Sequence, residues 1–230
     1  MIDTQLSRSA LRVRPLFLGL ALLLPVLSSI SSGETGTPDS SIPVPAGANR
    51  VEEDWEIVIK EPSTATDSPQ LSIVFGPADP TSKTHAVFEL NHATQPSYLK
   101  GGMQLQCWWG EDLVDYRNQH HPSDLHINNE TITFTTATQT GSGKIQMEVL
   151  NGISTSFGTF GGESYLRASV NLAKSDLSDF DSDYSLQHSG CGWGKNRVSK
   201  FARKAIRYYD KNGTLAAQDT TERVIHQLEP

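Results

Sequence analysis

Alternation of apolar and polar residues is the strongest signal along the chain. In residues 102–109, apolar side chains occupy every second position: Met103, Leu105, Cys107 and Trp109. A two-residue period predicts a β-strand that is covered on one face only. Gln104, Gln106 and Trp108 then share the opposite face, where we expect contact with solvent.

The same period recurs in short segments separated by Gly, Pro and Asn. The predicted strands are residues 51–62, 71–75, 86–92, 103–109, 112–117, 131–139, 144–150 and 165–172. Residues 140–143, Thr-Gly-Ser-Gly, predict a hairpin turn, and Asn151-Gly152 predicts a tight type I′ turn before residues 153–157. Many short strands with such turns predict an all-β antiparallel sandwich of the jelly-roll type. The strand of residues 51–62 carries charges on one face, so we expect it near a sheet edge.

One segment, residues 197–209, fits two structures. Its apolar positions match a helical stripe, and its residues are good helix formers. Asn212-Gly213 follows, however, and a hairpin needs an extended arm before that turn. We therefore favour a strand, with a short helix as the alternative. Residues 223–228 predict a last short strand.

The N-terminal segment is typical of an export signal. Arg8, Arg12 and Arg14 precede the apolar residues 16–27, and small residues follow. We predict a signal peptide in residues 1–32, a flexible linker in residues 33–50 and a single β-sandwich domain in residues 51–228. Whether the signal is cleaved or retained as an anchor stays open. No later segment is apolar enough to span a membrane, which predicts an extracellular, cell-surface or periplasmic protein.

Charge narrows the classes of partner. The 230 residues have a net charge of −7, and without residues 1–31 the net charge is −9. An acidic domain repels a phosphate backbone, so nucleic acid is not an expected partner. One basic group interrupts the pattern, and we interpret it as a solvated face of one element: Lys195, Arg197, Lys200, Arg203, Lys204 and Arg207.

Several stretches carry a resemblance to a known family. They are VEEDWEIVIKEP, HAVFELNHATQP, GGMQLQCWWG, NETITF, IRYYDKNGTL and DTTERVIHQL. Together they resemble an uncharacterised family of secreted bacterial proteins of planctomycete type, over nearly all of residues 51–228. The resemblance implies a jelly roll of the concanavalin or laminin-G kind and a terminal strand at IRYYDKNGTL, and it implies no activity. The chain departs from the family at residues 107–109 and 191–193, Cys-Trp-Trp and Cys-Gly-Trp.

The solvent face of residues 102–109 is the first candidate binding site. Sugars stack their C–H faces on aromatic rings and hydrogen-bond to carboxamides. Trp108 with Gln104 and Gln106 therefore predicts a carbohydrate site. For Trp109 and Trp193 we expect core packing, and for Trp108 structural cover remains the alternative.

Two acidic patterns provide alternatives. Glu52, Asp54 and Glu56 are similar to the carboxylate strand of retaining jelly-roll glycosidases, in which two carboxyl groups act as nucleophile and acid/base. A charged edge strand that deters pairing explains them equally well. Asp179, Asp181 and Asp183 could hold Ca²⁺, although no EF-hand pattern is present, and a solvated acidic loop is the simpler interpretation.

A third candidate site is rich in histidine. His120, His121, Asp124 and His126 could ligate a metal, but no fixed register directs them to one point.

The two cysteines leave two possibilities open. Cys107 and Cys191 form a disulfide if they meet in an oxidising compartment, or Cys107 is a small buried hydrophobe.

From these observations we predict an exported, non-catalytic surface or binding module. Polysaccharide is the first expected ligand and no cofactor is expected. A retaining glycoside hydrolase and a structural protein that binds other cell-envelope proteins are the alternatives. The sequence does not determine the oligomeric state.

Overall fold

The computed structural model describes residues 42–60, 69–77, 83–90, 102–120, 125, 127–162, 165–192 and 194–228, and of residues 118–120 it describes the backbone only. The predicted signal segment, most of the predicted linker, Trp193, and His121, Asp124 and His126 lie outside the described residues. Among the described residues, no helix has both the length and the apolar character needed to cross a membrane.

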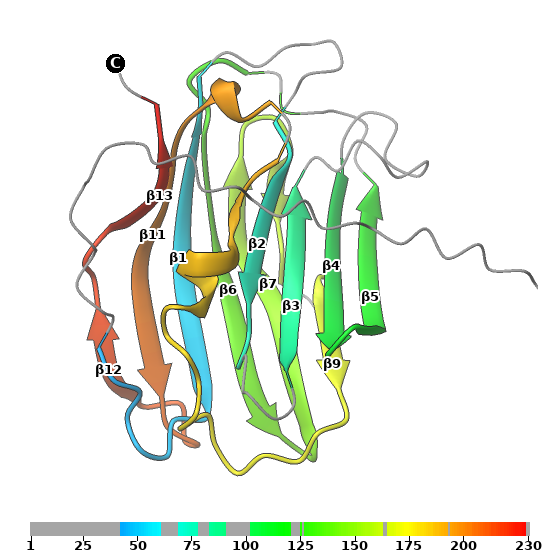
Figure 1. The fold of residues 1–230 in the computed structure, drawn as a ribbon, viewed down its shortest axis with the longest axis vertical. Helices are drawn as coiled ribbons and strands as arrows, with labels where there is room; N and C mark the ends of the chain where they lie inside the picture. Colours follow the sequence, from blue (N-terminus) through cyan, green and yellow to red (C-terminus); the bar gives the residue numbers. More distant parts are fainter. Residues whose placement is uncertain are drawn as a thin grey trace, which may run out of the picture. The chain divides into compact units, whose positions relative to one another are not determined.

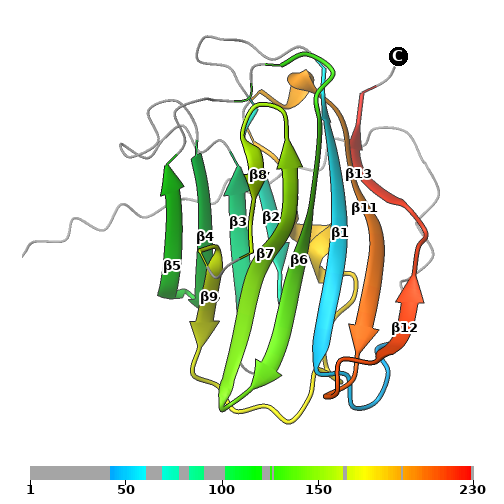
Figure 2. The same cartoon turned by 180° about the vertical axis from the view of Figure 1, so that it is seen from behind.

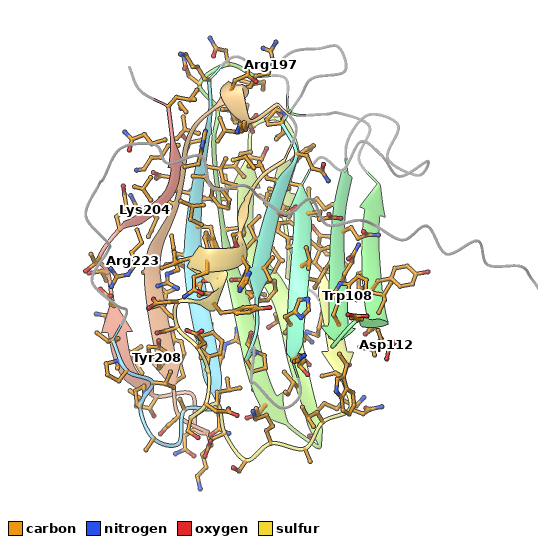
Figure 3. All side chains as sticks on the ribbon, viewed as in Figure 1. Trp108, Asp112, Arg197, Lys204, Tyr208 and Arg223 are labelled. Atoms are coloured by element: carbon orange, nitrogen blue, oxygen red, sulfur yellow. The ribbon has the colours of Figure 1, made fainter. Side chains whose placement is uncertain are left out.

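The chain folds as an antiparallel β-sandwich, as the alternating pattern predicted (Figures 1 and 2). The larger sheet has the order β12 (Leu215–Asp219), β11 (Val198–Tyr209), β1 (Arg50–Ile59), β6 (Thr131–Gly141), β7 (Lys144–Ser154) and β8 (Gly158–Phe160), with β13 (Arg223–Gln227) beside β11 and β9 (Arg167–Val170) beside β7. The smaller sheet has the order β10 (Gly190–Cys191), β2 (Leu71–Phe75), β3 (Thr84–Leu90), β4 (Gly102–Trp109) and β5 (Asp112–His120). Figure 3 shows the side chains on this fold, with Trp108 on the smaller sheet and Tyr208 on the larger.

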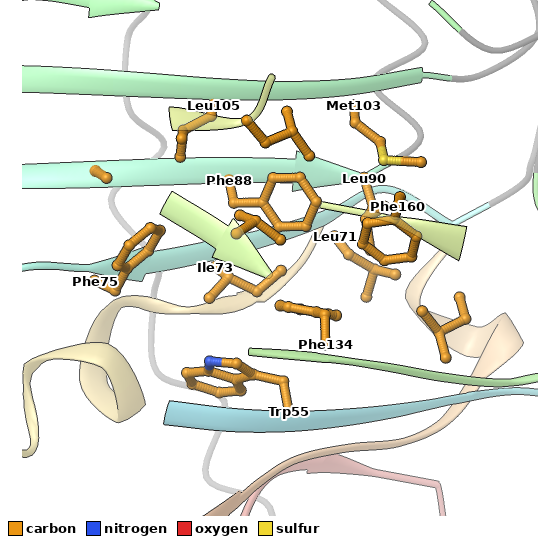
Figure 4. Packing of buried hydrophobic residues seen from close by; sticks show 14 of the residues in the cluster. Trp55, Leu71, Ile73, Phe75, Phe88, Leu90, Met103, Leu105, Phe134 and Phe160 are labelled. Atoms are coloured by element: carbon orange, nitrogen blue, oxygen red, sulfur yellow. The ribbon is translucent and has the colours of Figure 1, made fainter. Parts of the chain in front are cut away.

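The main core lies between the two sheets (Figure 4). Alternate residues of β2, β3 and β4 point inward and are fully buried, and they meet Trp55, Phe134 and Phe160 from the larger sheet. The rings of Phe88 and Phe134 meet edge to face, with centroids 5.3 Å apart. Burying each such side chain stabilises the fold by about 1.5–3 kcal/mol, so this double layer of apolar residues holds the sheets together.

A second apolar cluster covers the part of the larger sheet near β1 and β11. Ile206 and Tyr208 of β11 pack there against Ala48, Leu177 and Phe180. Ala48 is part of this cluster, and Ile42 and Val44 pack against it. The carbonyl oxygen of Ala48 accepts the backbone N–H of Leu177 at 2.7 Å, and the side chain of Asn49 donates to the carbonyl oxygen of Ser175 at 2.8 Å. This part of the predicted linker is therefore packed onto the domain, and the prediction of a domain start at residue 51 was too late.

Two local predictions were wrong for reasons of pairing. β1 is a central strand, paired with β11 on one side and β6 on the other, so it is not near an edge. Asn151-Gly152 does not form a hairpin turn. It makes a bulge inside β7, where Asn151 has a φ of 53° and the register with β6 shifts. The ring of Phe160 fills the space beside Gly152, and a Cβ there would lie 2.3 Å from it.

The ambiguous segment is a strand, as favoured from the hairpin signal. A 3-10 turn, η1 (Lys195–Arg197), precedes β11, and Ser142-Gly143 forms the predicted hairpin turn between β6 and β7. One member of the basic group, Arg203 on β11, points inward and is buried. It bonds to Glu53 of β1 at 2.8 Å, under the short helix α1 (Tyr184–His188). The interpretation of that group as one solvated face was therefore wrong for Arg203.

Candidate ligand-binding face

The outward face of the smaller sheet brings together side chains from neighbouring strands. Gln104 and Gln106 of β4 lie opposite Glu89 and Val87 of β3, and Trp108 lies opposite His85. In an antiparallel pair, side chains directly opposite one another are on the same face and about 5 Å apart at Cβ. This face, which we call the ligand face, is therefore polar at the Glu89 end and aromatic at the Trp108 end.

The three residues predicted to bind a ligand form one hydrogen-bonded chain. The indole N–H of Trp108 donates to Oε1 of Gln106 at 3.0 Å, and the amide of Gln106 donates to Oε1 of Gln104. Trp108 and Gln106 are partly buried, and Gln104 is buried, with 6% of its surface exposed, so the expectation that this face contacts solvent is wrong for Gln104. The bonds hold both carboxamides and the indole in fixed orientations, which lowers the entropy lost when a ligand binds.

A row of rings crosses the ligand face at its Trp108 end. The ring planes of Trp108 and His85 are inclined by only 7°, with centroids 6.5 Å apart. The ring centroid of Tyr184 on α1 lies 6.3 Å from that of His85, and the ring centroid of His188 lies 4.3 Å from that of Tyr184. We call these four residues the aromatic belt. His85, Tyr184 and His188 were not predicted as site residues from the sequence; for His85 the alternation of residues 85–90 was a usable signal.

Burial shifts the protonation of this face toward neutral side chains. It lowers the pKa of His85, despite a bond from its Nδ1 to the carbonyl oxygen of Lys83 at 3.1 Å. Burial also raises the pKa of Tyr184, with a smaller contribution from Asp181. At the polar end, burial raises the pKa of Glu89 to about 7. Burial thus favours the neutral forms of Glu89 and His85, which suits a neutral polar ligand.

Trp109 is placed differently from the prediction. The alternation assigned it to the core face, yet it is 43% exposed. It is the last residue of β4, opposite Asp112 and next to the turn at Gly110, where the core no longer extends. The two-residue period predicts which face of the sheet a side chain is on. It does not predict whether the opposite sheet extends far enough to bury that side chain.

The carboxylates proposed for glycosidase chemistry lie on the outward face of the larger sheet, and each has a cationic partner. Glu52 accepts a bond from Arg50 at 2.8 Å, and Asp54 accepts two from Arg207 at 2.5 and 2.7 Å. Glu56 accepts a bond from Lys200 at 2.9 Å, which lowers the pKa of Glu56. A general acid needs a raised pKa, so these surroundings favour a structural role.

The acidic loop does not gather its carboxylates. Asp179 pairs with Lys174 at 2.5 Å, Asp181 accepts the backbone N–H of Asp183, and Asp183 lies 4.0 Å from Arg203. Within the described ranges, no group of three or more His, Cys, Asp or Glu residues could hold a metal ion. The side chain of His120 and its three neighbouring candidate ligands are outside those ranges.

The cysteines do not pair in this structure. Cys107 lies on β4 and Cys191 on β10, separated by β2 and β3, and both are free thiols. Three strand spacings of about 4.8 Å separate them, well beyond disulfide geometry. Burial raises the pKa of each thiol to about 12. Of the two possibilities, the structure has Cys107 as a small buried hydrophobe.

Comparisons with known proteins add little to this geometry. No family model matches the sequence, and no curated protein matches it. A similar solved structure is the crystal structure of scytalido-glutamic peptidase with a transition state analog inhibitor. The two chains are 12% identical, the match covers 79% of this chain and 85% of that one, and the TM-score is 0.26. A likeness this weak carries no argument about activity.

Proposed function

We propose that the protein is an exported binding module whose ligand face takes a carbohydrate. The observation that carries the proposal is the aromatic belt next to two hydrogen-bonded carboxamides on one outward sheet face. Aromatic rings offer an apolar platform for the C–H face of a sugar, and carboxamides supply donors and acceptors for its hydroxyls. Export is supported by the sequence of residues 1–32.

The length of the ligand face favours an extended ligand. His85 and Glu89 are four residues apart on one strand, which separates the two ends of the face by about 13 Å. A glycan stacked on Trp108 would continue over Gln106 toward Gln104 and Glu89. Below pH 7, a protonated Glu89 would add a hydrogen-bond donor at the far end.

The test is a thermal-shift and calorimetric screen of the full chain against neutral and acidic polysaccharides, with Ca²⁺ and with chelator. For a polysaccharide that binds, Trp108→Ala should weaken affinity at least about tenfold, because it removes the stacking surface. Trp108→Phe should retain most of the affinity.

The matched control is Trp109→Ala, which removes the neighbouring exposed tryptophan outside the ligand face and should change affinity less than about twofold. Equal binding by Trp108→Ala and the unmodified chain would contradict the proposal. A chain that binds none of the polysaccharides would contradict the carbohydrate assignment.

A further inference from the structure

Exposed apolar side chains gather at one edge of the smaller sheet. Seven large hydrophobic residues of the described chain are strongly exposed, and four of them lie at the β4–β5 end: Trp109, Leu113, Val114 and Tyr116. Single exposed hydrophobic residues are ordinary, but a contiguous group on a soluble domain marks an interaction surface. Figure 3 shows this end of the sheet beside the labels of Trp108 and Asp112.

The edge itself is open within the described residues. β5 is the last strand of its sheet, and no described strand pairs with its outer side. The backbone N–H of Tyr116 bonds to Oδ1 of Asp115 at 2.9 Å, and its carbonyl accepts a bond from Arg117 at 2.6 Å. Local side chains thus occupy backbone groups that a neighbouring strand would otherwise bond. An unpaired edge with apolar side chains is a template for another strand.

We propose that β5 pairs with β5 of a second copy of this chain, antiparallel about a two-fold axis. In this arrangement Leu113 lies opposite Tyr116 of the partner subunit, and Asp112 lies opposite Arg117 of the partner subunit. Each contact occurs twice because the interface is symmetric. The pairing joins two five-stranded sheets into one, with both ligand faces on the same side.

The register follows from the faces of β5. Tyr116 lies opposite Gln106, and Leu113 lies opposite Trp108, so both point to the outward face. They share that face although they are three residues apart, because the register with β4 skips Val114. Asp112 and Arg117 point to the other face in the same way. The proposed register therefore matches apolar with apolar residues on one face and opposite charges on the other.

Charge complementarity identifies a second copy as the occupant. In the proposed pairing, Asp112 of each copy faces Arg117 of the other, so one surface carries both charges and complements itself. In the isolated chain Arg117 bonds to Asp115 at 2.5 Å and is 43% exposed. Pairing would move this exposed guanidinium to Asp112 of the partner subunit and free the backbone of Tyr116 for the new strand.

Charge reversal tests the pairing. Sedimentation velocity of the full chain over a range of concentrations should show a monomer–dimer equilibrium. Asp112→Arg or Arg117→Asp alone would place like charges opposite each other and should raise the dimer dissociation constant at least about tenfold. The double variant Asp112→Arg/Arg117→Asp restores opposite charges in both places, and its dissociation constant should return to within about threefold of the original.

A backbone block and a distant control complete the test. Tyr116→Pro should abolish the dimer, because proline removes the backbone N–H that Tyr116 would donate to the partner strand. Val224→Lys changes another exposed apolar residue, on β13, and should leave the dimer unchanged. A monomer at every concentration would overturn the proposal. So would a dimer that survives Tyr116→Pro or one that the double variant fails to restore, and either result would point to another surface.

Discussion

The two sheets hold their outward carboxylates in opposite surroundings. On β1 of the larger sheet, Glu52, Asp54 and Glu56 each accept bonds from Arg or Lys. The bond from Lys200 lowers the pKa of Glu56, whereas burial alone raises that of Glu89 on β3 to about 7. The pKa of a glutamate carboxyl group is thus lowered on one sheet and raised on the other.

This difference suggests different roles for the two outward faces: the carboxylates of the larger sheet stabilise the fold, and the carboxyl group of the smaller sheet can contact a ligand. A carboxylate bonded to a guanidinium has used its acceptor capacity and its charge on the neighbouring strand. Glu89, which lies opposite the carboxamide of Gln104, has its pKa raised to about 7 by burial and therefore titrates near neutral pH. Perturbed pKa values of this kind concentrate at functional sites. This difference is why we propose the ligand site on the smaller sheet.

The largest expected effect comes from removing Arg203 of β11, the cation that pairs with the buried Glu53 of β1. Glu53 and Arg203 point to the inner side of the larger sheet, and both side chains are 2% exposed. Arg203→Met should lower the free energy of unfolding by about 3–5 kcal/mol, because it leaves a buried carboxylate without its charge partner. Urea unfolding followed by tryptophan fluorescence measures this change.

Lys204→Met is the matched control. Lys204 lies on the same strand and pairs with Glu56 at 3.6 Å, but its side chain is 37% exposed. An exposed pair contributes about 0–1 kcal/mol, so this variant should be nearly as stable as the unmodified chain. If both variants lose the same stability, burial does not distinguish the two pairs.

Glu89→Gln should change how stability depends on pH. A folded-state pKa raised from 4.5 to about 7 means that Glu89 stabilises the fold fully below pH 4.5 and that this contribution is lost as pH rises through 7. The decline amounts to at most about 3 kcal/mol. Glutamine does not titrate, so the decline should be absent from the variant in urea unfolding between pH 4.5 and 8.

Glu56→Gln is the control here, because the pKa of Glu56 is lowered. Its folded-state contribution is present above pH 4.5 and is lost only on acidification, with the opposite sign. This variant should keep the decline toward pH 7. A Glu89→Gln chain with the unmodified pH profile would show that Glu89 titrates normally.

Local patterns in the sequence predicted most of the fold. Period-two alternation fixed the inward residues of β2, β3 and β4, because side-chain direction in a strand depends on neighbouring positions alone. The errors arose where pairing partners matter. The charges on β1 indicated an edge, yet Arg207 and Lys200 of β11, more than 140 residues away, neutralise them. Asn151-Gly152 has hairpin composition and lies in a bulge instead.

The candidate site was predictable only in part for the same reason. Gln104, Gln106 and Trp108 lie on one strand, so their common face was visible in the sequence. His85 joins them through the β3–β4 register, and Tyr184 joins through a five-residue helix far along the chain. Neither strand register nor the placement of a short helix follows from local composition.

The smallest expected effect comes from neutralising two outward carboxylates of the larger sheet. In the double variant Glu52→Gln/Glu56→Gln, partly exposed ion pairs are lost, which should lower the free energy of unfolding by about 1 kcal/mol or less per pair. Affinity for any polysaccharide should stay within about twofold, because both residues lie on the outward face of the other sheet.

Reducing-sugar release from the same polysaccharide measures turnover. If the unmodified chain releases sugar and the double variant does not, the larger sheet would be the functional one, since a retaining glycosidase cannot act without its two carboxyl groups. Unchanged binding by this variant, combined with loss of binding in Trp108→Ala, would instead assign recognition to the neutral face and charge pairing to the stability of the fold.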